Sequence, residues 1–70
     1  MATFKAIGYD LQRKSENKLF THAVIFRNNR NEIGADFHTS ILLAEKNVKA
    51  HSKRFWIEVI EIVLVEKVGA

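Results

Sequence analysis

The fold is decided by the last long apolar run of the chain, Phe55 to Val68, which has the sequence FWIEVIEIVLVEKV. Half of its fourteen residues are Val or Ile. Because a branched Cβ restricts a side chain in a helix but packs well on a pleated sheet, the run predicts a long β-strand. Its apolar side chains fall on both faces of that strand. We therefore expect it to lie inside a sheet, since at a bare edge it would promote aggregation.

The acidic residues of this run bear on its register. Glu58 and Glu61 have opposite parity, so in a regular strand their side chains would point to opposite faces. One extra residue near Val59 and Ile60, a β-bulge, would bring both glutamates to the same face. The bulged strand has one face made of Phe55, Ile57, Val59, Ile60, Ile62 and Leu64, and an opposite face made of Trp56, Glu58, Glu61, Val63 and Val65. The alternative is a regular strand, buried on both faces, that tolerates two glutamates at its margins.

Length and composition limit the class of protein. Seventy residues form one domain, and a chain of this size buries only about 60% of its unfolded surface, so its core gives marginal stability. A hydrophobic content of 47% is typical of a folded globular domain. The absence of cysteine excludes disulfides and thiolate metal sites. No signal peptide or membrane-spanning run is evident, so we expect a cytoplasmic protein.

The net charge of +3 is unevenly distributed. Residues 11–54 carry nine Lys or Arg and four acidic residues, whereas residues 55–70 carry one Lys and three Glu. The basic surface should therefore lie away from the last strand. An imbalance of this size only weakly favours anionic partners, because most small basic domains are simply soluble.

Two further strands are predicted upstream. Residues 2–11 alternate, and we interpret them as the first strand, with a bulge or a close backbone approach at Gly8. Residues 12–18 contain no apolar side chain and predict a solvated hairpin loop. Residues 19–27 alternate again and predict the second strand. The asparagine-rich segment 28–31 ends that strand, and Gly34 extends the break.

A change of period predicts a helix from Thr39 to about Lys53, capped by Thr39 or Ser40. An apolar stripe with helical spacing is formed by Phe37, Ile41, Ala44, Val48 and Phe55, which we expect to pack against the sheet. Leu42 and Leu43 lie off the stripe. They indicate either a later helix start or a second apolar surface. The predicted fold is α+β: a small three-stranded sheet with one packed helix, in β-β-α-β order.

This arrangement leaves apolar surface uncovered, because one helix covers only one face of a three-stranded sheet. Exposed apolar patches usually mark interfaces, and twofold contacts are the commonest oligomeric solution. We therefore expect a homodimer. The candidate contact is the face of the last strand that carries Trp56, Val63 and Val65.

No catalytic or metal motif is recognisable. His22, His38 and His51 have no metal-ligand spacing, and the serines have no nucleophile-elbow context. The three glycines form no phosphate-binding loop. We expect no cofactor and no enzymatic activity. The chain resembles no family that we can recognise.

The hypothesis that this protein binds nucleic acid depends on clustered cations. Lys46, Lys49 and Lys53 share a helix face, and Arg13 and Lys14 lie close together in one loop. Phosphates attract such clusters, although the same lysines are also typical of a solvated helix face. The sequence thus predicts a non-catalytic interaction module, homodimeric, with a nucleic-acid-binding accessory protein as the alternative. It does not identify the partner or the pathway.

Overall fold

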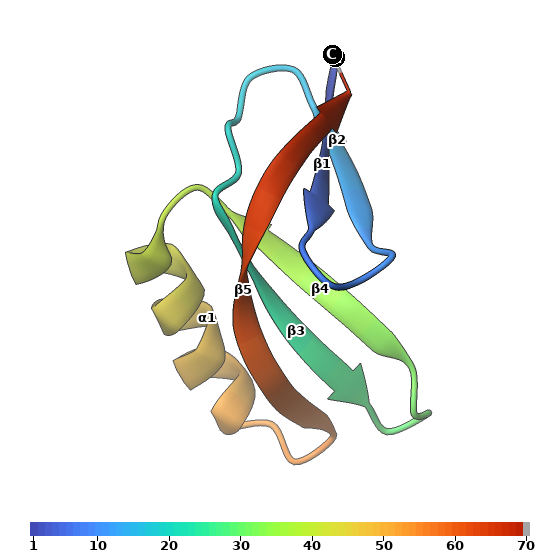
Figure 1. The fold of residues 1–70 in the computed structure, drawn as a ribbon. Helices are drawn as coiled ribbons and strands as arrows, with labels where there is room; N and C mark the ends of the chain where they lie inside the picture. Colours follow the sequence, from blue (N-terminus) through green and yellow to red (C-terminus); the bar gives the residue numbers. More distant parts are fainter. Residues whose placement is uncertain (70) are drawn as a thin grey trace.

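The structure is a computed structural model that describes residues 1–69, and these residues form five strands and one helix (Figure 1). The elements are β1 (Ala2–Ala6), β2 (Gln12–Ser15), β3 (His22–Asn28), β4 (Ile33–His38), α1 (Ile41–Ser52) and β5 (Ile57–Gly69). All neighbouring strands are antiparallel, in the order β2-β1-β5-β3-β4, and the sheet curls into a nearly closed barrel. The α+β class is confirmed.

The predicted three-stranded sheet with β-β-α-β order is wrong. Two short strands were interpreted as non-strand segments. The first is β2, whose exposed side chains QRKS carry no apolar signal, so the sequence reads as a loop. The second is β4, where Gly34 and the preceding asparagines predict a continued break. The first strand also ends earlier than expected, at Ala6, because the chain turns at Gly8 with φ of 91°.

The long strand β5 occupies the centre of the sheet, as the apolar run predicts. Its first part pairs with β3 and its last part with β1, so it joins the two halves of the barrel (Figure 1). The register shifts where Ile25 pairs with Glu61 and Phe26 with Val59, leaving Ile60 as the extra residue. The β-bulge prediction is therefore confirmed.

The bulge directs the two glutamates to the same face as Val63 and Val65. Glu58 lies across from Arg27, with 3.7 Å between the charged atoms. Glu61 accepts a hydrogen bond from the Tyr9 hydroxyl, and this bond is the main reason that the pKa of Tyr9 is raised.

The core lies inside the barrel. Phe20 makes edge-on contacts with Phe4 and Phe37, with ring centroids 5.4 Å and 5.8 Å apart. An edge-on aromatic pair contributes about 0.5–1.5 kcal/mol of stability beyond the contribution from burying its surface area. The remaining buried members of this cluster are Ala6, Ala23 and Ile25. The curl of the sheet thus covers one of its own faces, which a flat three-stranded sheet would have left open.

The helix covers the other face of β3, β4 and β5 (Figure 1). It begins after Ser40, whose hydroxyl accepts the backbone N–H of Leu43 at 3.2 Å, so the predicted cap is confirmed. The predicted apolar stripe is only partly correct. Its helical members Ala44 and Val48 are buried and half-buried, respectively, but Ile41 is exposed and Phe55 is 96% exposed beyond the helix end. Phe37 is buried, but in β4.

Candidate functional site

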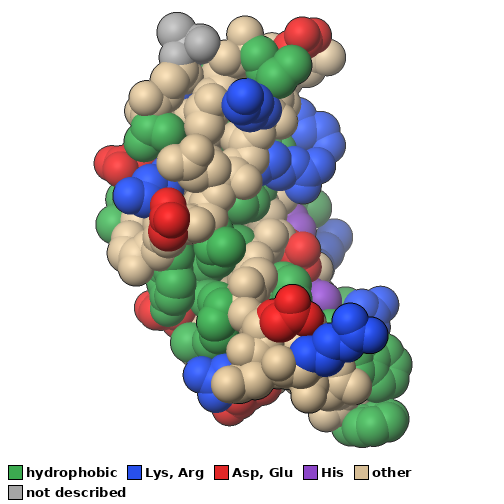
Figure 2. Space-filling view, turned by 90° about the vertical axis from the view of Figure 1, so that its right-hand side faces the viewer, with side chains coloured by type: hydrophobic (Ala, Val, Ile, Leu, Met, Phe, Trp, Pro, Cys, Tyr) green, Lys and Arg blue, Asp and Glu red, His purple; other side chains and the backbone are tan. Residues whose placement is uncertain are grey.

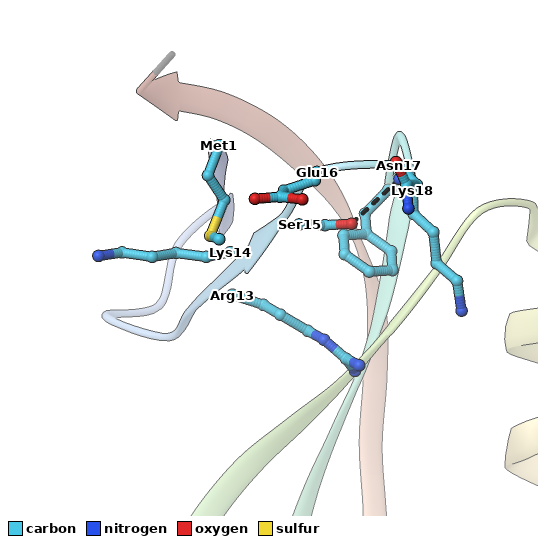
Figure 3. A pocket seen from close by; sticks show the side chains of 8 residues that line it. Met1, Arg13, Lys14, Ser15, Glu16, Asn17 and Lys18 are labelled. Atoms are coloured by element: carbon cyan, nitrogen blue, oxygen red, sulfur yellow. Dashed lines mark hydrogen bonds between the residues drawn. The ribbon is translucent and has the colours of Figure 1, made fainter.

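A shallow basic cleft opens beside β2, and Figure 3 shows its lining residues. It has a volume of about 380 Å³ and is lined by Met1, Arg13, Lys14, Ser15, Glu16, Asn17, Lys18 and Phe20. Three cations and one carboxylate give the cleft a net positive charge. The chain bends here because the backbone N–H of Lys18 donates to Ser15 Oγ at 3.0 Å.

The cations of this cleft do not converge on one point. Lys14 and Lys18 extend away from each other in different directions (Figure 3). Arg13 lies over the Phe20 ring, with its guanidinium carbon 5.2 Å from the ring centroid. Phe20 itself is only 6% exposed, so its ring is not free to stack on a base. The cleft suits a loosely held anion better than a base-specific contact.

The predicted nucleic-acid residues form two separate groups. Arg13 and Lys14 belong to β2, whereas Lys46 and Lys49 belong to α1 and Lys53 follows it directly. All five are exposed. In Figure 1, α1 and β2 lie on opposite sides of β5, so the fold does not combine the two groups into one patch. A phosphate backbone would have to wrap around the molecule to reach both.

A buried polar cluster joins α1 to the sheet. The imidazole of His51 is 6% exposed, and its Nε2 lies 2.7 Å from Asp36 Oδ2 in β4. The ring also packs against Phe26, with centroids 5.3 Å apart. Gly34 makes room for the Phe26 ring, because a Cβ at Gly34 would lie 2.8 Å from Phe26 Cζ. His51, and not Phe55 as predicted, therefore makes the last contact of the helix with the sheet.

The chemistry of this cluster is limited by what surrounds it. His51 Nδ1, Asn47 Oδ1 and His38 Nε2 are buried without a hydrogen-bond partner in the part of the chain that the structure describes. Among the described residues, the hydrogen-bond partner of the His51 ring is the Asp36 carboxylate, which binds at Nε2. Within residues 1–69, no three His, Asp or Glu side chains are close enough to hold a metal. The cluster can therefore fasten the helix to the sheet.

The predicted dimer residues occupy different environments. Val63 and Val65 are half-buried and pack against the barrel interior, which leaves them little free surface. Trp56 lies in the turn before β5, where it is 45% exposed and packs edge-on against Phe55. Their role in a dimer remains a prediction.

Apolar side chains are nevertheless abundant on the surface. Figure 2 looks at the side of the molecule that carries β2 and the β3–β4 hairpin, and hydrophobic groups reach the surface there between charged ones. The exposed large apolar residues are Met1, Ile7, Leu19, Ile33, Ile41, Leu42, Leu43, Phe55, Trp56, Ile60, Leu64 and Val68. Leu42 and Leu43 face solvent in the first turn of the helix, which begins at Ile41, later than the predicted start at Thr39.

Sequence reasoning missed β4, although a signal was present. Ile33, Ala35 and Phe37 alternate with Gly34 and Asp36 at the period of a half-buried strand. It also missed the pairing of Asp36 with His51, fifteen residues away, because only the packing of α1 on β4 brings the two together.

Comparison with family models, with curated proteins and with solved structures found no match. Among the described residues, no helix has both the length and the apolar character needed to cross a membrane.

Proposed function

We propose that this protein is a non-catalytic interaction module that works as a homodimer. The observation that carries the proposal is the imbalance between core and surface. Among residues 1–69, eight hydrophobic residues are buried, three of them alanines, whereas twelve large hydrophobic residues are exposed. A soluble domain with this distribution gains stability when a partner covers part of that surface.

The curled sheet changes the basis of this proposal. The sequence predicts a dimer because one face of a flat sheet lacks cover, but the curled sheet covers that face itself. The support comes instead from side chains that remain exposed after the barrel has formed, such as Leu19 at 71%, Leu42 at 69% and Leu64 at 60%.

Light scattering after size exclusion tests the proposal. At micromolar concentration we expect twice the chain mass of 8.1 kDa. Apolar association is not weakened by salt, so the dimer should persist as the salt concentration rises. A monomer that remains soluble at about millimolar concentration would contradict the proposal.

The basic cleft favours a second candidate function, a nucleic-acid-binding accessory protein. Arg13, Lys14 and Lys18 give it local positive charge, and Lys46, Lys49 and Lys53 supply a separate basic helix face. Binding should weaken steeply with salt, and replacing the three helix lysines by Gln should lessen the slope by about one for each lost phosphate contact. An NMR titration with DNA and RNA oligonucleotides at low salt tests this function, which the absence of any shift would exclude.

A further inference from the structure

β4 is an edge strand with unused backbone hydrogen-bonding groups. It pairs with β3 on one side and ends the sheet on the other. The backbone N–H of Asn28 donates to the carbonyl of Glu32 at 3.0 Å, which makes these two residues a hydrogen-bonded pair. Hydrogen-bonded and non-hydrogen-bonded pairs alternate along an antiparallel ladder.

The alternation decides which groups of β4 remain free. Counting from Asn28, the residues of β4 that exchange hydrogen bonds with β3 are Gly34, Asp36 and His38. The N–H and C=O groups of Ile33, Ala35 and Phe37 therefore point toward the open side of the sheet. The register of β4 on β3 contains no bulge that would bend this edge away.

The side chains of β4 do little to block a partner. Charge, proline and bulges are the usual means of protecting an edge. β4 contains one charged residue, Asp36, and its carboxylate is engaged by His51 on the helix side. The chain contains no proline. Among the described residues, no backbone hydrogen bond reaches the outer side of β4, and its side chains offer that edge little protection.

The sequence of β4 is complementary to itself in one register. When Ala35 of one copy lies opposite Ala35 of another, Ile33 faces Phe37 and Gly34 faces Asp36. In this register Ile33, Ala35 and Phe37 all form hydrogen-bonded pairs, and an apolar cross-strand pair forms at each end. A shift that centres the pairing on Asp36 places two carboxylates opposite each other, which is unfavourable. A shift that centres it on Gly34 leaves the free groups of Phe37 without a partner.

We infer that β4 pairs with β4 of a second copy, antiparallel about a twofold axis at Ala35, and so joins two barrels through a continuous sheet. This inference rests on the proposed homodimer and specifies where its two copies meet. We call this β4–β4 contact the seam. It differs from a contact through Trp56, Val63 and Val65. The exposed side chain of Ile33 is covered by the second copy in this arrangement, which adds apolar contact to the backbone hydrogen bonds.

A single cysteine tests the seam directly, because the chain has none of its own. Residues in a hydrogen-bonded antiparallel pair have Cα atoms about 5.5 Å apart, within the range of about 4.4–6.8 Å that a disulfide spans. Mild oxidation of Ala35→Cys should yield a covalent dimer on a non-reducing gel. Lys14→Cys, on the exposed edge strand β2, is the matched control and should yield only the small fraction produced by random collision.

A second variant tests the seam without a new bond. Ile33→Lys places a charge opposite Phe37 of the other copy. The mass of this variant in solution should therefore be the monomer value and not twice 8.1 kDa. Leu42→Lys adds the same charge on the exposed helix surface and should leave the dimer intact. Circular dichroism of both variants checks that they remain folded. If the seam is correct, both variants should give the same spectrum as the wild type.

The outcomes separate the seam from the proposed function. A wild-type dimer that is unaffected by Ile33→Lys, with Ala35→Cys cross-linking no better than Lys14→Cys, would overturn the seam and leave the homodimer standing. A wild-type chain that is monomeric at all concentrations would overturn both. Selective cross-linking at Ala35 together with dissociation of the folded Ile33→Lys variant would support both.

Discussion

β2 and β4 are both edge strands of one sheet, yet they expose opposite chemistry. β2 has the sequence QRKS, and its Arg13 and Lys14 side chains are exposed along the edge. β4 places Ala35 and Phe37 against the core, leaves Ile33 exposed, and commits its one carboxylate to the helix. Charged edges resist pairing with other chains. The comparison indicates that one edge of this sheet is protected and the other is available.

The largest expected difference between the two edges is in stability. Phe37→Ala removes a ring that is 7% exposed and contacts Phe20, so it should lower the free energy of unfolding by about 3–5 kcal/mol. Lys14→Ala on β2 should change it by less than about 0.5 kcal/mol. Urea denaturation followed by circular dichroism measures both. Similar losses for the two variants would show that β2 contributes as much as β4.

A smaller effect is expected at Gly34, where β4 must approach Phe26 closely. In Gly34→Ala the new Cβ would lie 2.8 Å from Phe26 Cζ, so the ring must move from its place beside His51. Overpacking of this kind costs about 1–3 kcal/mol. Gly69→Ala is the control, because its Cβ would meet Thr3 at an ordinary 3.4 Å. The prediction fails if thermal unfolding shows the two alanine variants to be equally stable.

The link between β4 and the helix should contribute somewhat less. Asp36→Ala leaves the buried imidazole of His51 without its hydrogen-bond partner, which should cost about 1–2 kcal/mol. Glu45→Ala removes an exposed carboxylate from the same helix and should have almost no effect. Thermal melts at neutral pH compare the two. If Asp36→Ala melts with the wild type, the pair does not hold α1 on the sheet.

The smallest effect concerns Tyr9, in the turn that leads into β2. Its hydrogen bond to Glu61 raises its pKa above that of the unfolded chain. The stability that this bond supplies is therefore fully present below about pH 10 and is lost as the pH rises through the folded pKa. The stability difference between wild type and Tyr9→Phe should shrink over that range.

Titration of Tyr9 is directly measurable, because the chain has one tyrosine. The absorbance of tyrosinate should appear at higher pH in the folded protein than in the chain denatured in urea. Equal midpoints would indicate that Glu61 does not bind the hydroxyl in solution. The Glu61→Gln variant is the control and should lower the folded midpoint.

The comparison of the edges also shows where sequence reasoning failed. β2 was missed because its sequence, QRKS, contains no apolar residue. It therefore shows no alternation of apolar and polar side chains. β4 was missed because Gly34 reads as a breaker, although here it accommodates the Phe26 ring. The predicted helix stripe included Phe55, since spacing alone cannot show that the helix ends at Ser52 and that His51 makes the final contact.

The sequence by itself determined the long central strand, its bulge and the capped helix. Each depends on local chemistry: branched residues at both parities between Ile57 and Val65, two glutamates out of phase, and a hydroxyl at Ser40 before the first turn. The tertiary structure alone decided that the sheet curls to bury its own face, that Asp36 meets His51, and that β4 ends the sheet. These depend on contacts between residues far apart in the chain, which no local pattern encodes.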